Sequence, residues 1–131
     1  RHKGGQQMTQ PDILMLLDDL SDTQRAIVLL LAKKIQEKET RAKQLGVEES
    51  HQRLYCLTTK DQRELLPDMP IAEATETIWW ELSGLMKFSL HRSKKATGCC
   101  DRWIMKYQKY QTNAIYIMID VGMLDIYRKL V

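Results

Sequence analysis

Cysteines and long apolar runs are both scarce in this chain of 131 residues. The three cysteines, Cys56, Cys99 and Cys100, include no C-x-x-C pair and have no histidine at metal-ligand spacing. They therefore predict neither a disulfide framework nor a metal site, and they are typical of reduced thiols in a cytoplasmic protein. The longest apolar run, Ala26 to Ala32, is far shorter than the ~20 residues of a membrane span, so we expect no membrane partner.

Catalytic and nucleotide-binding motifs are missing as well. The three histidines, His2, His51 and His91, are scattered along the chain and fit no triad, relay or metal spacing. The glycine pair at residues 4–5 lacks both the preceding strand and the Lys-Ser/Thr of a phosphate-binding loop. We therefore expect a protein that is not an enzyme and that holds no cofactor.

Charge is divided unevenly along the chain, although the net charge is only +3. Residues 1–84 hold 11 Lys and Arg against 14 Asp and Glu, whereas residues 85–131 hold 9 against 3. The basic C-terminal part indicates a surface for an anionic partner, of which nucleic acid is the common case. A basic face that is merely solvated would have the same composition.

The N-terminal part of the chain predicts two helices. Residues 1–10 carry no periodic apolar pattern and are expected to fray, and a short apolar helix is expected after Pro11. Ser21 and Gln24 have the spacing of a capping box, which predicts the start of a long helix that ends toward Gly46. The apolar residues on the buried face of that helix are Ile27, Val28, Leu30, Leu31 and Ile35.

A β-prone segment at residues 53–59 precedes two shorter predicted helices. Thr59 and Gln62 have capping-box spacing, so the first of these helices is expected to begin there. The second is expected between Pro70 at its start and Gly84 at its end. Its apolar stripe comprises Ile71, Ala74, Ile78 and Leu82, and both Trp79 and Trp80 are expected in the core or in an interface.

Alternating apolar and polar residues predict three strands after Gly84, and a final helix follows them. The first two strands are separated by a turn with the sequence "SKKATG". The residues that share one face in each strand are Met86, Phe88 and Leu90, then Trp103, Met105 and Tyr107, then Ile115, Ile117 and Ile119. The final helix is expected to bury Met123, Leu124, Tyr127 and Leu130.

This order of elements predicts an α+β fold, in which two short helices followed by a strand pair form a winged helix. We expect one domain over residues 11–131, with extra N-terminal helices, a small antiparallel sheet or hairpin wing, and a closing C-terminal helix. Because the chain starts without Met and stops within a periodic segment, we expect it to be a fragment of a longer protein.

Three blocks of the sequence, taken in order, resemble the N-terminal winged-helix domain of iteron-binding plasmid replication initiators, the Rep proteins. The opening helices of that family are similar to "LMLLDDLSDTQRAIVLLLAKKI". Its strand and helix-turn-helix are similar to "RLYCLTTKDQRELLPDMPIAEATETIWWELSGLM", and its closing strands and helix to "DRWIMKYQKYQTNAIYIMIDVGMLDIYRKLV". The chain departs from the family in its second short helix, where "AEATETIWW" replaces the usual Ala-Tyr pair.

The resemblance implies a division of work between two winged-helix domains of a replication initiator. A second domain, outside this chain, would read most of the repeat sequence at the plasmid origin. The present domain would contribute contacts to the phosphate backbone of double-stranded DNA and an interface for a homodimer. Host replication proteins are further partners that the resemblance implies.

The predicted recognition helix, residues 71–82, is poorly suited to a DNA groove lined by phosphates. It carries Glu73, Glu76 and Glu81 but neither Lys nor Arg. We therefore expect backbone contacts from the strands and their turn, where the candidate DNA-binding residues are Arg92, Lys94, Lys95, Arg102, Lys106 and Lys109. The need to protect strand edges against aggregation would also explain these charges.

Apolar residues on both faces of the strands predict a second packing layer, which is either the N-terminal helices or another subunit. The candidate residues for a homodimer interface are Tyr107, Tyr110, Tyr116 and Met118. An alternative function is a non-enzymatic regulatory or accessory domain that binds a protein partner through the acidic helix at residues 71–82.

Overall fold

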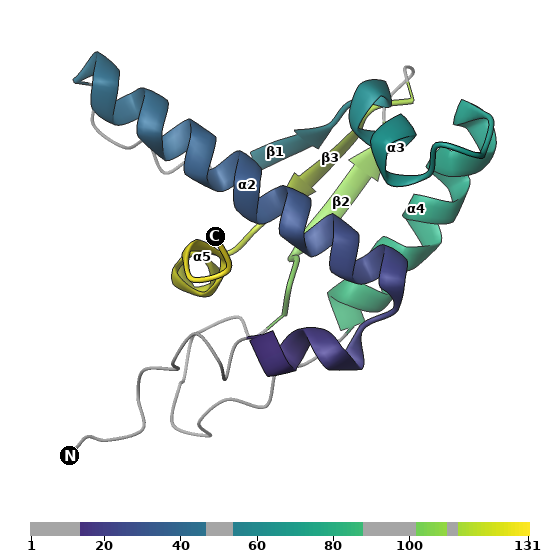
Figure 1. Cartoon of the computed structure of the whole chain (residues 1–131), viewed down its shortest axis with the longest axis horizontal. Helices are drawn as coiled ribbons and strands as arrows, with labels where there is room; N and C mark the ends of the chain where they lie inside the picture. The colour runs from purple at the N-terminus through teal and green to yellow at the C-terminus, as the bar shows by residue number, and fades with distance from the viewer. Residues whose placement is uncertain (1–13, 47–53, 88–101, 110–112) are drawn as a thin grey trace.

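The computed structural model describes residues 14–46, 54–87, 102–109 and 113–131. The fold is α+β, mostly helical, with one small antiparallel sheet of three strands (Figure 1). The elements in chain order are η1 (Leu17–Asp19), α2 (Asp22–Leu45), β1 (Leu54–Leu57), α3 (Thr59–Leu65), α4 (Ile71–Lys87), β2 (Lys106–Lys109), β3 (Ile115–Met118) and α5 (Val121–Arg128).

Helix α2 begins and ends as its sequence predicts. The Ser21 hydroxyl accepts a hydrogen bond from the Gln24 amide, and the Gln24 side chain accepts one from the Ser21 amide, so the capping box is confirmed. The helix ends where Gly46 adopts a left-handed conformation with φ 67°. Its buried face differs from the prediction at two positions, because Ala32 is buried and Leu30 is only half-buried.

The predicted capping box of α3 is wrong by one residue. Thr58, not Thr59, is the N-cap, and Asp61, not Gln62, supplies the reciprocal side-chain bond. Both pairs have the same spacing in the sequence, but the side chain of Gln62 lies inside the protein and makes other hydrogen bonds. Burial therefore decides between two capping patterns that the sequence leaves equivalent.

The predicted end of α4 is also wrong. The helix starts after Pro70 as expected, but it passes through Gly84 and ends at Lys87. A Cβ atom at Gly84 would lie 2.3 Å from Nε2 of Gln24, so a larger residue there would displace the end of the Gln24 side chain of α2. Met86 consequently belongs to a helix and not to a strand, while Phe88 and Leu90 lie outside the described residues.

The three strands are ordered β1-β3-β2, and both pairings are antiparallel. The predicted inward face of β3 is confirmed, because Ile115 and Ile117, and Ile119 after the strand, are fully buried. Strand β2 is shorter than expected. Trp103 and Ile104 are both fully buried, so the chain does not alternate between faces until the strand begins at Lys106.

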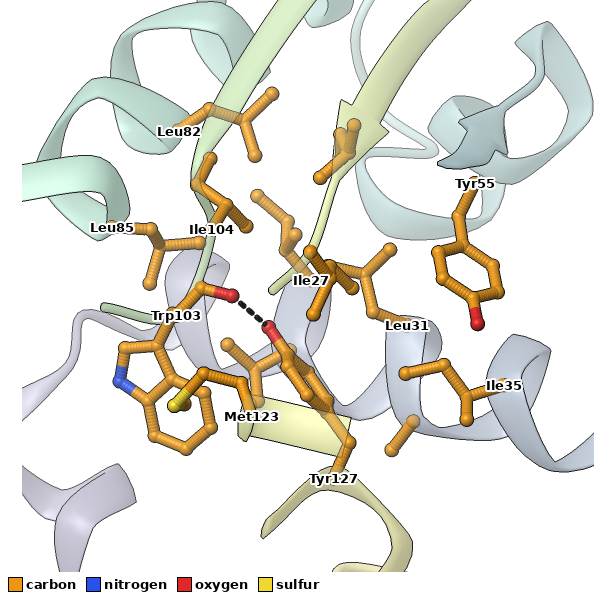
Figure 2. Close-up of a cluster of buried hydrophobic side chains, with 14 of the residues drawn as sticks. Ile27, Leu31, Ile35, Tyr55, Leu82, Leu85, Trp103, Ile104, Met123 and Tyr127 are labelled. Atoms are coloured by element: carbon orange, nitrogen blue, oxygen red, sulfur yellow. Dashed lines mark hydrogen bonds between the residues drawn. The ribbon is translucent and has the colours of Figure 1, made fainter. Parts of the chain in front are cut away.

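The core lies between the sheet and the helices. Figure 1 shows α2 running across the sheet, and α2 packs against β1, α4 and α5. In Figure 2 the Tyr127 hydroxyl of α5 donates a hydrogen bond of 2.7 Å to the Trp103 carbonyl, which joins α5 to the segment before β2. Burial raises the pKa of Tyr127 well above its ordinary value.

A second polar contact of α5 lies at the surface and joins this helix to α2. Nε and Nη2 of Arg128 donate to the Glu39 carboxylate over 2.9 and 2.6 Å, and these bonds raise the pKa of Arg128. The predicted apolar face of α5 is confirmed, since Met123, Leu124, Tyr127 and Leu130 are all buried. None of the helices in the described ranges combines the length and the apolar character that crossing a membrane requires.

Candidate nucleic-acid interface

The basic side chains that the structure describes gather at one edge of the sheet. Among the strands of the described residues the order is β1-β3-β2, so within that part of the chain β2 is an edge strand, paired with β3 alone. Lys106 and Lys109 on β2 are exposed, and so is Arg102 shortly before it. None of the three takes part in the ion pairs found among the described residues. As far as the described residues show, these three cations are exposed and could meet an anion.

The two lysines lie on opposite faces of the sheet. Lys106 is paired with Met118 in the strand register and Lys109 with Ile115, so their side chains leave β2 in opposite directions. They flank the edge and do not form a patch on one face. This arrangement suits contact with phosphates along a backbone better than contact with a row of base edges.

The other three predicted DNA-binding residues, Arg92, Lys94 and Lys95, lie outside the described residues. Their contribution to DNA binding stays a prediction. The candidate interface consists, in the structure, of Arg102, Lys106 and Lys109.

Helix α4 carries its negative charge on exposed positions, as the sequence indicates. Glu73 and Glu76 are exposed, whereas Glu81 is half-buried and accepts a hydrogen bond of 3.1 Å from the Ser21 hydroxyl at the start of α2. One of the three carboxylates is thus a packing group, and two face solvent. A helix with this exposed face would repel a phosphate backbone.

The two neighbouring tryptophans of α4 have different environments. Trp79 is half-buried and stacks edge-on against Tyr107 of β2, with 4.5 Å between ring centroids. This contact confirms a packing role for Trp79 and places α4 directly beside the basic strand. Trp80 is 69% exposed and is therefore not a core residue, so of the predicted core or interface position only the interface stays a prediction.

Gln62 is a structural residue whose role the sequence does not reveal. Its side chain is fully buried, and Nε2 donates hydrogen bonds to the carbonyls of Leu57 (3.1 Å) and Asn113 (2.7 Å). Its Oε1 accepts a hydrogen bond from the Thr75 hydroxyl. One amide therefore connects β1, α3, α4 and the segment that leads into β3. The sequence signal that could have indicated this role is the position of Gln62 on the inner face of α3, because a buried polar group without a hydrogen bond would be costly.

The predicted homodimer residues do not share one face of the sheet. Tyr107 is paired with Ile117 in the register and lies on the side that packs on α4, whereas Tyr116 and Met118 alternate with Ile117 and lie on the other side. Tyr116 and Met118 are half-buried, and Tyr110 lies outside the described residues. These four side chains consequently do not form one continuous surface.

Cys56, the one cysteine in the described ranges, lies in β1 opposite Tyr116. Burial raises the pKa of its thiol, although a hydrogen bond with Tyr116 acts in the opposite direction. A raised pKa makes the thiol less reactive. Within the described part of the chain, no three His, Cys, Asp or Glu side chains are grouped as a metal site.

No family model, curated protein or solved structure matches this chain.

Proposed function

We propose that this chain is a winged-helix DNA-binding domain that contacts the phosphate backbone of duplex DNA and associates with itself. The observation that carries the proposal is the sheet topology. The helix pair α3–α4 lies in the chain between β1 and the β2–β3 hairpin, and β3 pairs with both other strands. That order of helices and strands is the one expected of a helix-turn-helix followed by a wing.

The charge distribution supports backbone contact by the hairpin and not by the helix. Arg102, Lys106 and Lys109 are exposed on and just before β2, and the exposed carboxylates of α4 disfavour insertion of that helix into a groove. Contacts with phosphates position a protein on DNA without reading the sequence. We propose this positioning role for the domain.

The particular protein that we propose is the N-terminal domain of a cytoplasmic, non-enzymatic plasmid replication initiator. Support comes from the resemblance of the three sequence blocks, which together cover most of the chain. In this proposal the DNA is the set of repeats at the origin, a further domain reads their sequence, and host replication proteins are additional partners.

A second candidate function is an accessory domain that binds a protein partner through α4. The observation that favours it is Trp80, a large aromatic side chain that is 69% exposed beside Glu73 and Glu76. Exposed tryptophans are common anchors of protein interfaces.

The test of DNA contact is fluorescence anisotropy of a labelled random duplex with the full chain over a salt series. Combined Arg102→Glu, Lys106→Glu and Lys109→Glu changes are expected to lower the affinity and to flatten the dependence of log K on log salt, by about 0.9 for each phosphate that the variant no longer neutralises. The matched control reverses the same number of exposed charges on α2, at Lys33, Arg41 and Lys43.

The control distinguishes a local surface from net charge alone. An equal loss of affinity in the two triple variants would mean that the duplex responds only to the overall charge. Absence of binding by the unmodified chain at low salt would exclude the proposed DNA contact.

A further inference from the structure

On its exposed side, α4 carries one acidic and one basic residue at equal sequence separations from Trp80. Glu73 precedes Trp80 by one heptad and Lys87 follows it by one heptad. All three side chains are exposed. A helix drifts by only ~20° per heptad, so the three lie along one stripe. We call Glu73, Trp80 and Lys87 the Trp80 stripe.

The stripe faces away from the core. The buried residues of α4, which include Ala74, Ile78, Leu82 and Leu85, occupy the opposite side of the helix. Neither Glu73 nor Lys87 takes part in any ion pair between described residues, so both charges are available to a partner. The helix beneath them is held firmly, because Trp79 packs on Tyr107 and Gly84 lies against Gln24 of α2.

We propose that the Trp80 stripe is the self-association surface of this protein, and that it binds the same stripe of a second copy in antiparallel orientation. With a two-fold axis at Trp80, residues equally distant from it in the two helices meet. Each Glu73 then faces the Lys87 of the other copy, and the two indoles pack together at the axis.

Charge selects this orientation over the others. A parallel pair would place Glu73 against Glu73 and Lys87 against Lys87, and like charges in contact are strongly unfavourable. At the intermediate positions an antiparallel pair brings Thr77 of one copy near Gly84 of the other on one side of the indoles, and Glu76 near Ser83 on the other side. Thr77, Ser83 and Gly84 are small and half-buried, which leaves space for the indoles.

This inference rests on the self-association part of the proposed function and does not depend on DNA contact. It also gives α4, the helix that stands in the position of a recognition helix, a role that requires no contact with DNA. The basic edge of β2 takes no part in the stripe.

The first test is sedimentation velocity of the full chain between about 1 μM and about 1 mM, a range that detects even weak association. Trp80→Ala is expected to raise the dimer Kd by about 30-fold or more, as for a central aromatic anchor. The matched control is Leu45→Ala on α2, because Leu45 is 68% exposed and lies outside the stripe. Its dimer Kd is expected to stay unchanged.

The second test uses charge exchange to examine the antiparallel geometry. Glu73→Lys and Lys87→Glu are each expected to weaken the homodimer by about tenfold or more, because each places like charges together. The double variant Glu73→Lys/Lys87→Glu is expected to dimerise again, since it restores both opposite pairs. An equimolar mixture of the two single variants is expected to form heterodimers for the same reason. Circular dichroism would verify that each variant is folded.

Three outcomes would overturn the proposal. They are a chain that stays monomeric throughout the concentration range, a folded double variant that fails to regain the dimer, and a dimer that Leu54→Ser abolishes while Trp80→Ala leaves it intact. Leu54 is exposed on the same sheet face as Met118, so the last outcome would assign self-association to that face. Anisotropy of the duplex with Trp80→Ala reports separately on DNA contact, which this variant is expected to leave unchanged.

Discussion

Helix α4 and strand β2 pack against each other and yet expose opposite charges. The contact between them is made by Trp79 and Tyr107. Beyond it, α4 presents Glu73 and Glu76 to solvent, while β2 presents Lys106 and Lys109. One packing contact therefore separates an acidic surface from a basic one. This difference is the basis on which we propose separate partners for the hairpin and for the helix.

The two regions also differ in how they are fastened to the rest of the protein. Helix α4 is fixed by apolar packing on α2 and by the hydrogen bonds of Gln62 and Glu81. Strand β2 is fixed by its pairing with β3 and by the ring of Tyr107. Substitutions can therefore disturb one region while the other remains as a reference.

The largest loss of stability is expected when the aromatic contact that joins the two regions is removed. Trp79→Ala removes the ring that packs on Tyr107 and is predicted to lower the free energy of unfolding by about 3 kcal/mol. The matched control is Trp80→Ala, the neighbouring and mostly exposed tryptophan, for which a change within about 0.5 kcal/mol is expected at protein concentrations where the chain is monomeric. Urea denaturation of both variants measures the difference. Equal losses in the two would contradict the environments described for these side chains.

The second largest loss of stability is expected from replacing Gln62, whose side-chain amide bonds the helix pair to the hairpin. Gln62→Leu keeps the volume of the side chain but leaves the carbonyls of Leu57 and Asn113 without their buried donor, at a predicted cost of about 2 kcal/mol. Gln36→Leu on the exposed side of α2 is the control and should be nearly neutral. Urea midpoints test this, and faster amide exchange near Asn113 should accompany the loss. Unchanged exchange there would mean that the amide does not hold the hairpin.

Local patterns in the sequence predict the helical part of this fold well. The capping box at Ser21, the left-handed Gly46 and the apolar faces of α2 and α5 depend on neighbours within one or two turns, so the sequence contains the information. The same holds for β3, whose strict alternation of isoleucine reflects one buried face.

Other features depend on contacts between distant segments and could not be read locally. Gly84 is a typical stop signal, but the proximity of Gln24 from α2 makes it a packing residue. The choice between Thr58 and Thr59 as N-cap depends on the burial of Gln62. At the candidate site, composition located the basic strand, but only the edge position of β2 and its register show that Lys106 and Lys109 flank the sheet on opposite faces.

A smaller, pH-dependent effect on stability is expected from the ion pair between α3 and α2, and none from the strands. Burial raises the pKa of Asp61, but hydrogen bonds from Lys34 and Thr58 outweigh it and hold the pKa below its ordinary value. Asp61 contacts Nζ of Lys34 on α2 over 2.8 Å. Because the folded-state pKa is the lower one, the stabilisation is complete above the unfolded-state pKa of about 3.9 and is lost as the pH falls through the folded-state value.

The prediction for Asp61 is therefore a loss on the order of 1 kcal/mol at neutral pH in Asp61→Asn, with a flatter decline of stability in acid. Strands β2 and β3 contain no carboxylate, so they carry no equivalent acid-sensitive contact. Urea midpoints at pH 7 and pH 3 measure the loss of stability at neutral pH and the decline of stability in acid. An Asp61→Asn variant that declines as steeply as the unmodified chain would show that other carboxylates control the acid response. Asp22→Asn, which alters an exposed carboxylate paired only within α2, is the control.

The smallest effect on stability, and the sharpest on binding, is expected from the exposed charges themselves. Glu73→Gln with Glu76→Gln, and separately Lys106→Gln with Lys109→Gln, should each change the free energy of unfolding by less than about 0.5 kcal/mol, since these groups are exposed. The lysine pair should reduce the salt dependence of duplex binding by about 0.9 for each phosphate contact, whereas the glutamate pair should leave that slope unchanged. If neutralising the glutamates raised the affinity for DNA as much as neutralising the lysines lowered it, DNA would be responding to net charge. The separation of the two surfaces by the Trp79–Tyr107 contact would then have no functional meaning.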